Sequence, residues 1–83
     1  MPRVKIYVTN YCHFCRKAKS LLTKKKIPFE AFDVTDDDEK RSWLVETTGY
    51  RTVPQIFIDE KPIGGFDQLV ELDKEGKLEA LTS

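Results

Sequence analysis

The chain has 83 residues, of which 40% are hydrophobic and 34% charged. This length predicts one domain, residues 1–83, near the lower limit for a core that is stable without disulfides, metals or partners. Lys plus Arg and Asp plus Glu balance at 14 each, so no net field attracts nucleic acid or an anionic membrane. No apolar run approaches the roughly 20 residues that span a bilayer. The first residues also lack the apolar stretch of a signal peptide, and we therefore expect a cytoplasmic protein.

The first elements change from a strand period to a helical period. Residues 4–8 alternate apolar and more polar side chains, which predicts a strand. From Cys12 onward the apolar positions follow a helical spacing, until Lys24–Lys26 and Pro28 end the helix. The expected apolar face of this helix holds Cys15, Ala18, Leu21 and Leu22.

Residues 29–34 predict a second strand, which the helical crossover makes parallel to the first. Asp36 and Glu39 have the spacing of a capping box and predict the start of a second helix. Gly49 is expected to end that helix in the left-handed conformation. We expect the helix to bury Trp43, Leu44 and Thr47.

The second half of the chain reads as a hairpin followed by a helix. Two short strands, residues 55–58 and 62–63, are joined by a turn. A third helix begins near Phe66 and is closed by Gly76. A final helical turn contains Leu78 and Leu81. The order β-α-β-α-β-β-α predicts an α/β fold in a single domain.

The stretch YCHFCR, residues 11–16, contains both cysteines and the only histidine. Structural zinc takes four Cys or His ligands, and this chain has only three such residues, so we expect no metal site. A permanent disulfide between Cys12 and Cys15 would close a very small loop and stabilise the fold little. A reactive dithiol is the remaining interpretation.

The two cysteines are expected to play different roles. The start of a helix favours a thiolate at Cys12, and Arg16 and Lys17 add positive potential. Cys15 lies one turn later on the apolar face, where burial favours the neutral thiol. We therefore expect Cys12 to attack a disulfide and Cys15 to resolve the mixed disulfide. Between them, His13 is expected to be exposed with a minor effect on Cys12, and Phe14 is expected to wall the site.

Three separated motifs resemble the glutaredoxin family: YCHFC at 11–15, TVPQIFI at 52–58 and GGFDQL at 64–69. Together they extend the resemblance over nearly the whole chain, as a single glutaredoxin domain. The implied fold is thioredoxin-like, a four-stranded mixed sheet with helices on both faces.

The resemblance also implies a glutathione site. Pro54 would form a cis peptide bond beside the cysteines, and the Val53 backbone would pair with the cysteinyl part of glutathione. The Phe66 and Asp67 amides would hold the γ-glutamyl carboxylate, and the Asp67 side chain would hold the ammonium. The implied glutathione-binding residues are Phe14, Arg51, Thr52, Val53, Pro54, Gly65, Phe66 and Asp67.

Two positions depart from the family pattern. His13 and Phe14 stand where many members have Pro and Tyr. Thr9 stands where many members have a Lys that helps to hold the glycine carboxylate of glutathione and supports the thiolate. Arg51 and Lys17 are candidates to replace that cation.

The resemblance implies a glutathione-dependent thiol–disulfide oxidoreductase that uses glutathione as co-substrate and needs no metal. Its implied partners are glutathione, protein disulfides or glutathionylated proteins and, indirectly, glutathione reductase, with the chain as a monomer. One alternative is a similar redoxin reduced by thioredoxin reductase. Another is a carrier of a [2Fe–2S] cluster between two chains, each giving Cys12, with glutathione as the other ligands.

Overall fold

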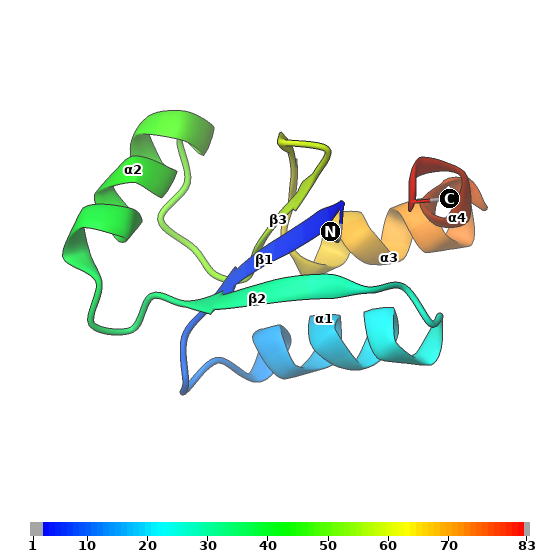
Figure 1. Ribbon diagram of the computed structural model, residues 1–83, viewed down its shortest axis with the longest axis horizontal. Helices are drawn as coiled ribbons and strands as arrows, with labels where there is room; N and C mark the ends of the chain where they lie inside the picture. The colour runs from blue at the N-terminus through cyan, green and yellow to red at the C-terminus, as the bar shows by residue number, and fades with distance from the viewer. Residues whose placement is uncertain (1–2, 83) are drawn as a thin grey trace.

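A four-stranded sheet with strand order β2-β1-β3-β4 forms the centre of the computed structural model, which describes residues 3–82 (Figure 1). The strands are β1 (Val4–Val8), β2 (Phe29–Asp33), β3 (Gln55–Ile58) and β4 (Lys61–Gly64). The helices are α1 (His13–Lys24), α2 (Asp38–Thr48), α3 (Phe66–Lys74) and α4 (Lys77–Thr82). The predicted element order is confirmed, and α4 is the helical turn expected at the end of the chain.

The sheet is mixed, as predicted. β1 pairs with β2 in parallel, because α1 carries the chain back across the sheet between them. β3 pairs antiparallel with both β1 and β4. Within residues 3–82, no helix has the length and apolar character needed to cross a membrane.

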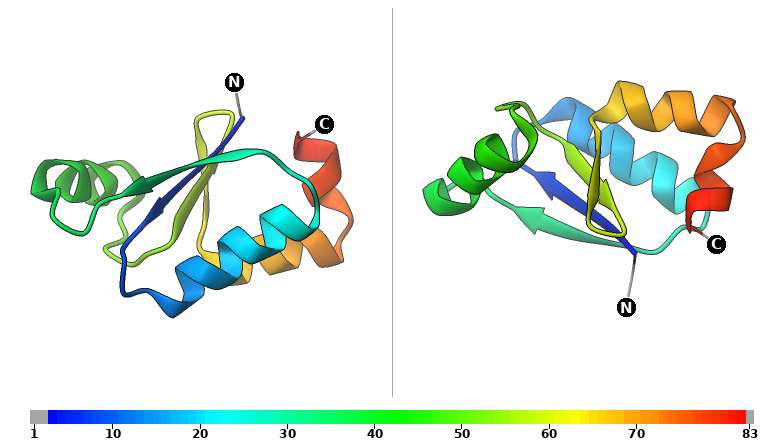
Figure 2. Two further views of the ribbon diagram at one scale, coloured as in Figure 1. Left: turned by 60° about the horizontal axis from the view of Figure 1, so that its bottom comes forward. Right: turned by 90° about the horizontal axis from the view of Figure 1, so that it is seen from above.

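Helices cover both faces of the sheet (Figure 2). On one face α1, α3 and α4 enclose the larger core. Its buried residues are Val4, Ile6, Val8, Cys15, Ala18, Leu22, Ile27, Ile56, Ile58, Leu69 and Leu78. On the other face α2 closes a smaller core of Tyr7, Val34, Leu44 and Phe57. The central strands β1 and β3 therefore contribute buried side chains to both faces, which is the thioredoxin-like arrangement expected.

The start of α2 differs from the prediction. The cap is Asp37, whose side chain accepts a hydrogen bond from the Lys40 amide at 3.0 Å, and the predicted box of Asp36 and Glu39 is wrong. The Asp37 amide donates to the Val34 carbonyl oxygen at 3.2 Å. Val34 is buried in the smaller core. The turn from Val34 to Asp37 therefore places Asp37, and not Asp36, at the start of the helix.

The buried face of α2 is also narrower than predicted. Only Leu44 is fully buried, while Trp43 is 39% exposed and Thr47 is exposed. Trp43 packs against two aromatic rings of the sheet. Its ring centroid lies 5.7 Å from that of Tyr7 and 5.8 Å from that of Phe57. At the other end of the helix, Gly49 has φ +80°, which confirms the left-handed cap.

Candidate active site

Cys12 is the N-cap of α1, as the sequence predicts, and it is partly buried. Its extended backbone, with φ −93° and ψ 115°, turns the side chain back over the first helical turn. The sulfur accepts a hydrogen bond from the Cys15 amide at 3.2 Å, and the thiol donates to the Val53 carbonyl oxygen at 3.5 Å. The Cys12 sulfur thus lies at the start of the helix with one backbone amide directed at it.

Cys15 lies one turn further into α1 and is only 2% exposed. Burial raises the pKa of its thiol to about 12, and a hydrogen bond with Cys12 adds to the rise. Both cysteines are free thiols in this structure. The pair therefore combines one reachable sulfur with one that stays protonated at neutral pH.

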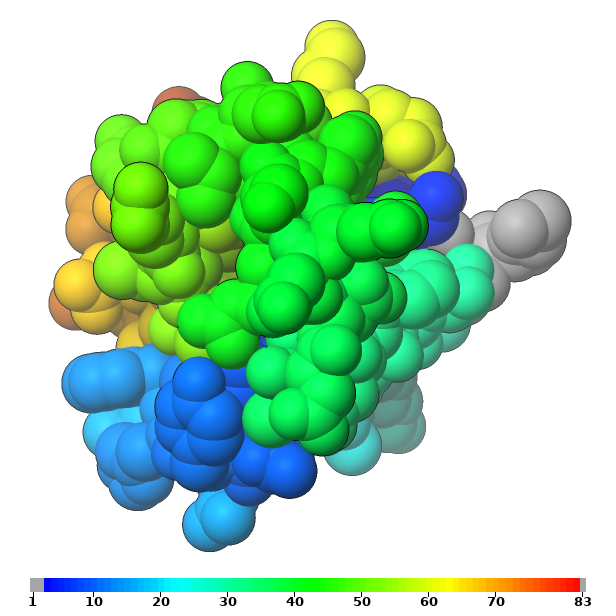
Figure 3. All heavy atoms as spheres, turned by 90° about the vertical axis from the view of Figure 1, so that its left-hand side faces the viewer, coloured from blue at the N-terminus to red at the C-terminus, as the bar shows by residue number. Residues whose placement is uncertain are grey.

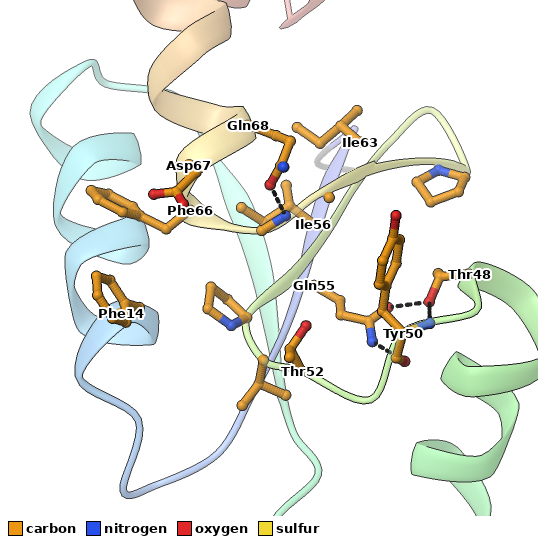
Figure 4. Close-up of a pocket in the computed structure, with 15 residues that line it drawn as sticks. Phe14, Thr48, Tyr50, Thr52, Gln55, Ile56, Ile63, Phe66, Asp67 and Gln68 are labelled. Atoms are coloured by element: carbon orange, nitrogen blue, oxygen red, sulfur yellow. Dashed lines mark hydrogen bonds between the residues drawn. The ribbon is translucent and has the colours of Figure 1, made fainter.

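A cavity of about 600 Å³ opens beside the cysteine loop (Figure 4). Its volume is within the usual range for small-molecule sites. Seven of the eight residues that the resemblance assigns to glutathione line it: Phe14, Thr52, Val53, Pro54, Gly65, Phe66 and Asp67. The three sequence motifs thus meet at one place, although up to about 50 residues of chain separate them.

The entry to β3 and the start of α3 approach each other closely in this cavity. The Val53–Pro54 peptide bond is cis, as the resemblance implies. A Cβ atom on Gly65 would lie 3.3 Å from the Pro54 carbonyl oxygen, so only glycine fits here without a shift. Gly65 caps α3, and its amide donates to Gln68 Oε1 at 2.9 Å. The next amides of a helix have no intrahelical acceptor, so they can bind an anionic ligand.

Aromatic rings form one rim of the cavity. Phe14 is 51% exposed, and its ring centroid lies 5.9 Å from that of Phe66. Lys17 Nζ lies 5.4 Å from the Phe14 centroid and 5.9 Å from the Phe66 centroid. This geometry holds a cation beside the cavity through the ring faces.

Thr9 stands at the position of the missing family lysine, and Arg51 is one of the two candidates to replace it; their surroundings differ. Thr9 is 4% exposed, and its hydroxyl has no hydrogen-bond partner among the described residues. It therefore offers neither charge nor reach to a ligand. Arg51 does not line the large cavity but a second hollow of about 470 Å³ against α2, together with Arg41 and Tyr50.

The start of α1 and the α2 region adjoin on one face of the molecule (Figure 3). Tyr11, just before Cys12, has its hydroxyl 3.5 Å from an Arg41 nitrogen, and the Asn10 amide donates to Thr35 Oγ1 at 2.9 Å. These contacts fix the cysteine loop against the segment that leads into α2.

Sequence reasoning did not identify several residues of the cavity. Thr48, Tyr50 and Gln55 line its end near α2, and Gln68 lines it near α3. The sequence assigns Gln55 to a strand and to the TVPQIFI motif but gives it no role in the site, and in the structure it is 5% exposed. A polar amide in an otherwise apolar strand was the one available signal, because buried polar groups need partners.

Metal ions and iron–sulfur clusters are held by groups of ligating side chains. Within residues 3–82, no group of three or more Cys, His, Asp or Glu side chains is placed to hold a metal ion. Because Cys15 is buried, a single chain presents only Cys12 to an iron–sulfur cluster, which does not suffice to hold one.

Comparison with known proteins agrees with this geometry. The sequence profile of the Glutaredoxin family matches residues 4–63. The chain is 41% identical to glutaredoxin 3 of Escherichia coli over 81 residues, covering 98% of each protein. It is 43% identical to a glutaredoxin of Pseudomonas aeruginosa over 83 residues, covering 100% of this chain and 99% of the relative. A crystal structure of a buckwheat glutaredoxin–glutathione complex superposes with a TM-score of 0.90 at 28% identity, covering 96% of this chain and 76% of that one.

The CxxC pair at the start of α1, the mixed sheet and the extent of the matches agree with one another. The chain belongs to the glutaredoxin family of thiol–disulfide oxidoreductases.

Proposed function

We propose that the protein is a glutathione-dependent thiol–disulfide oxidoreductase that reduces glutathione mixed disulfides and protein disulfides. The observation that carries the proposal is the position of Cys12. Its reachable sulfur lies at a helix start and contacts Val53, which lines a cavity that continues to the start of α3. One chain contains every protein group that the reaction needs, so we propose that it works as a monomer. We also propose that it works in the cytoplasm, where glutathione keeps thiols reduced.

The first step is attack by the Cys12 thiolate on the glutathione sulfur of a mixed disulfide. A bond forms between Cys12 and glutathione, and the client protein leaves as its thiolate. Once Cys12 has lost its proton, it no longer donates to the Val53 carbonyl oxygen. That oxygen then becomes an acceptor for the cysteinyl amide of glutathione, as in an added β-strand.

The cavity provides complementary groups for the rest of glutathione. The Phe66 and Asp67 amides at the α3 start suit the γ-glutamyl carboxylate, and the exposed Asp67 carboxylate suits the ammonium. Lys17 at the aromatic rim and Arg51 in the neighbouring hollow are the cations available for the glycine carboxylate. The solved complex of a buckwheat glutaredoxin with glutathione supports glutathione as the ligand.

The second step restores the dithiol. The thiolate of a second glutathione attacks the Cys12–glutathione disulfide, releases oxidised glutathione and regenerates the Cys12 thiolate. Glutathione reductase then reduces the released disulfide.

For a protein disulfide, Cys15 attacks the Cys12–client bond, and its proton passes to the departing client thiolate. Glutathione reduces the resulting Cys12–Cys15 disulfide.

The test is turnover of a small glutathione mixed disulfide, coupled to glutathione reductase and NADPH. Wild type should turn over, Cys12→Ser should be inactive, and Cys15→Ser should keep this activity because glutathione itself resolves the intermediate. Equal loss in both variants would overturn the roles of the two cysteines. A folded, reduced wild type without turnover would overturn glutathione dependence, and NADPH consumption with thioredoxin reductase would then identify the other donor.

A further inference from the structure

Two polar side chains outside the thiol chemistry hold the segment that binds glutathione. We propose that Gln55 and Thr48 are positioning residues for residues 49–54, the segment between α2 and β3. The inference rests on the proposed function and adds to it the residues that determine its substrate affinity.

Gln55 fastens the segment to the sheet. Its backbone belongs to the central strand β3, where it pairs with Tyr7, and its side chain is 5% exposed. The amide nitrogen donates to the Tyr50 carbonyl oxygen at 2.8 Å, and the amide oxygen accepts from the Thr48 hydroxyl at 2.8 Å (Figure 4). Both ends of the side-chain amide are therefore used.

Thr48 fastens the segment to the last turn of α2. Its hydroxyl oxygen accepts a hydrogen bond from the Tyr50 amide at 3.1 Å. Its single proton has two acceptors at 2.8 Å, the Leu44 carbonyl oxygen and Gln55 Oε1. Side chains thus hold both backbone polar groups of Tyr50, immediately after the left-handed turn at Gly49.

The segment held in this way carries the binding groups. Thr52, Val53 and Pro54 line the cavity, and the Val53 carbonyl oxygen contacts Cys12. Tyr50, with 64% of its surface exposed, stands at the end of the cavity near α2 (Figure 4). If the hydrogen bonds from either side chain to Tyr50 are removed, residues 49–54 sample other conformations. Only the fraction of molecules in which this segment has the correct conformation then binds glutathione. Apparent affinity falls by that fraction, whereas a bound substrate still reacts at the usual rate.

The experiment measures KM and kcat for a small glutathione mixed disulfide with three variants. Thr48→Val removes the hydroxyl at nearly constant shape, Gln55→Met removes the amide at similar volume, and Thr48→Ser keeps the hydroxyl as the matched control. Thr48→Val and Gln55→Met should raise KM about tenfold, as for a competent fraction of roughly one tenth, with kcat nearly unchanged. Thr48→Ser should retain the wild-type KM. A lower urea midpoint with unchanged KM would show a merely structural role and overturn the inference.

A second readout separates this inference from the proposed function. Wild-type turnover tests glutathione dependence, whereas amide hydrogen exchange at Tyr50 tests the tie without any substrate. Exchange at Tyr50 should be faster in Thr48→Val than in Thr48→Ser, because its acceptor is lost. Equal exchange in the two variants would overturn the inference, whether or not the wild type turns over glutathione.

Discussion

Cys12 and Cys15 should differ sharply in their reaction with iodoacetamide, although only two residues separate them. The thiolate is the form that reacts. Burial raises the pKa of Cys15 from the ordinary 9.0 to about 12, so at pH 8 only about one molecule in ten thousand carries this thiolate. An ordinary cysteine with a pKa of 9.0 would be ionised in about one molecule in ten. The 2% exposure of Cys15 slows its reaction further.

The assay is alkylation of the reduced native protein at pH 8, followed by peptide mass spectrometry. Cys12 should be modified at least about 100-fold faster than Cys15. Raising the pH from 8 to 10 should speed modification of Cys15 about 100-fold, because its thiolate fraction grows tenfold per unit below a pKa of about 12. Guanidinium-unfolded protein is the control, and both cysteines should react there at similar rates.

The Cys12→Ala variant, which has no hydrogen-bonding side chain at this position, separates the two causes of the raised pKa. Burial is the larger cause and the hydrogen bond with Cys12 the smaller one. Cys15 should therefore remain protected in this variant, with only a modest gain in rate. Modification of Cys15 within tenfold of the Cys12 rate in native wild type would refute the reasoning from burial and, with it, the separate roles of the two thiols.

Three further changes test other parts of the structure. Gly65→Ala places a Cβ 3.3 Å from the Pro54 carbonyl oxygen and should raise KM for a glutathione mixed disulfide about fivefold or more; an unchanged KM would contradict the close approach. Asp37→Ala removes the α2 cap and should lower the free energy of unfolding in urea by about 1 kcal/mol, while Asp36→Ala should leave it almost unchanged. A larger loss in Asp36→Ala than in Asp37→Ala would show that Asp36 caps the helix. Leu22→Ala empties a fully buried site and should lower the free energy of unfolding by about 2–5 kcal/mol, and a loss well below that range would show that the core collapses around the cavity.

The sequence was sufficient where local chemistry decides the outcome. Apolar period distinguishes a strand such as residues 4–8 from the following helix without knowledge of the partners. The same holds for the cysteine pair, because the helix start places Cys12 as the cap and Cys15 one turn inside. Gly49 ends α2 as predicted, since its left-handed conformation is a local preference of glycine.

Local patterns were insufficient where several residues satisfy the same rule. Three consecutive aspartates, Asp36 to Asp38, can each cap a helix, and the buried position of Val34 selects Asp37. The burial of Trp43 depends on how much apolar surface the sheet offers to α2, and that surface is small. A capping pattern or an apolar residue does not contain this information.

The sequence therefore identifies the residues of the candidate site, while the fold determines their environment. The CxxC pair, the TVP segment and the Gly65–Asp67 stretch can be read in order along the chain. Only the tertiary structure brings Phe14 of the cysteine motif, the TVP segment and the Gly65–Asp67 stretch around one cavity, and places the Cys12 sulfur against the Val53 carbonyl oxygen beside it. The hydrogen bonds of the Gln55 side chain to Thr48 and Tyr50 likewise join the start of β3 to the end of α2, which the sequence pattern does not show. The fold also raises the pKa of Cys15, since burial is a property of the packed core and not of a residue's neighbours in the chain.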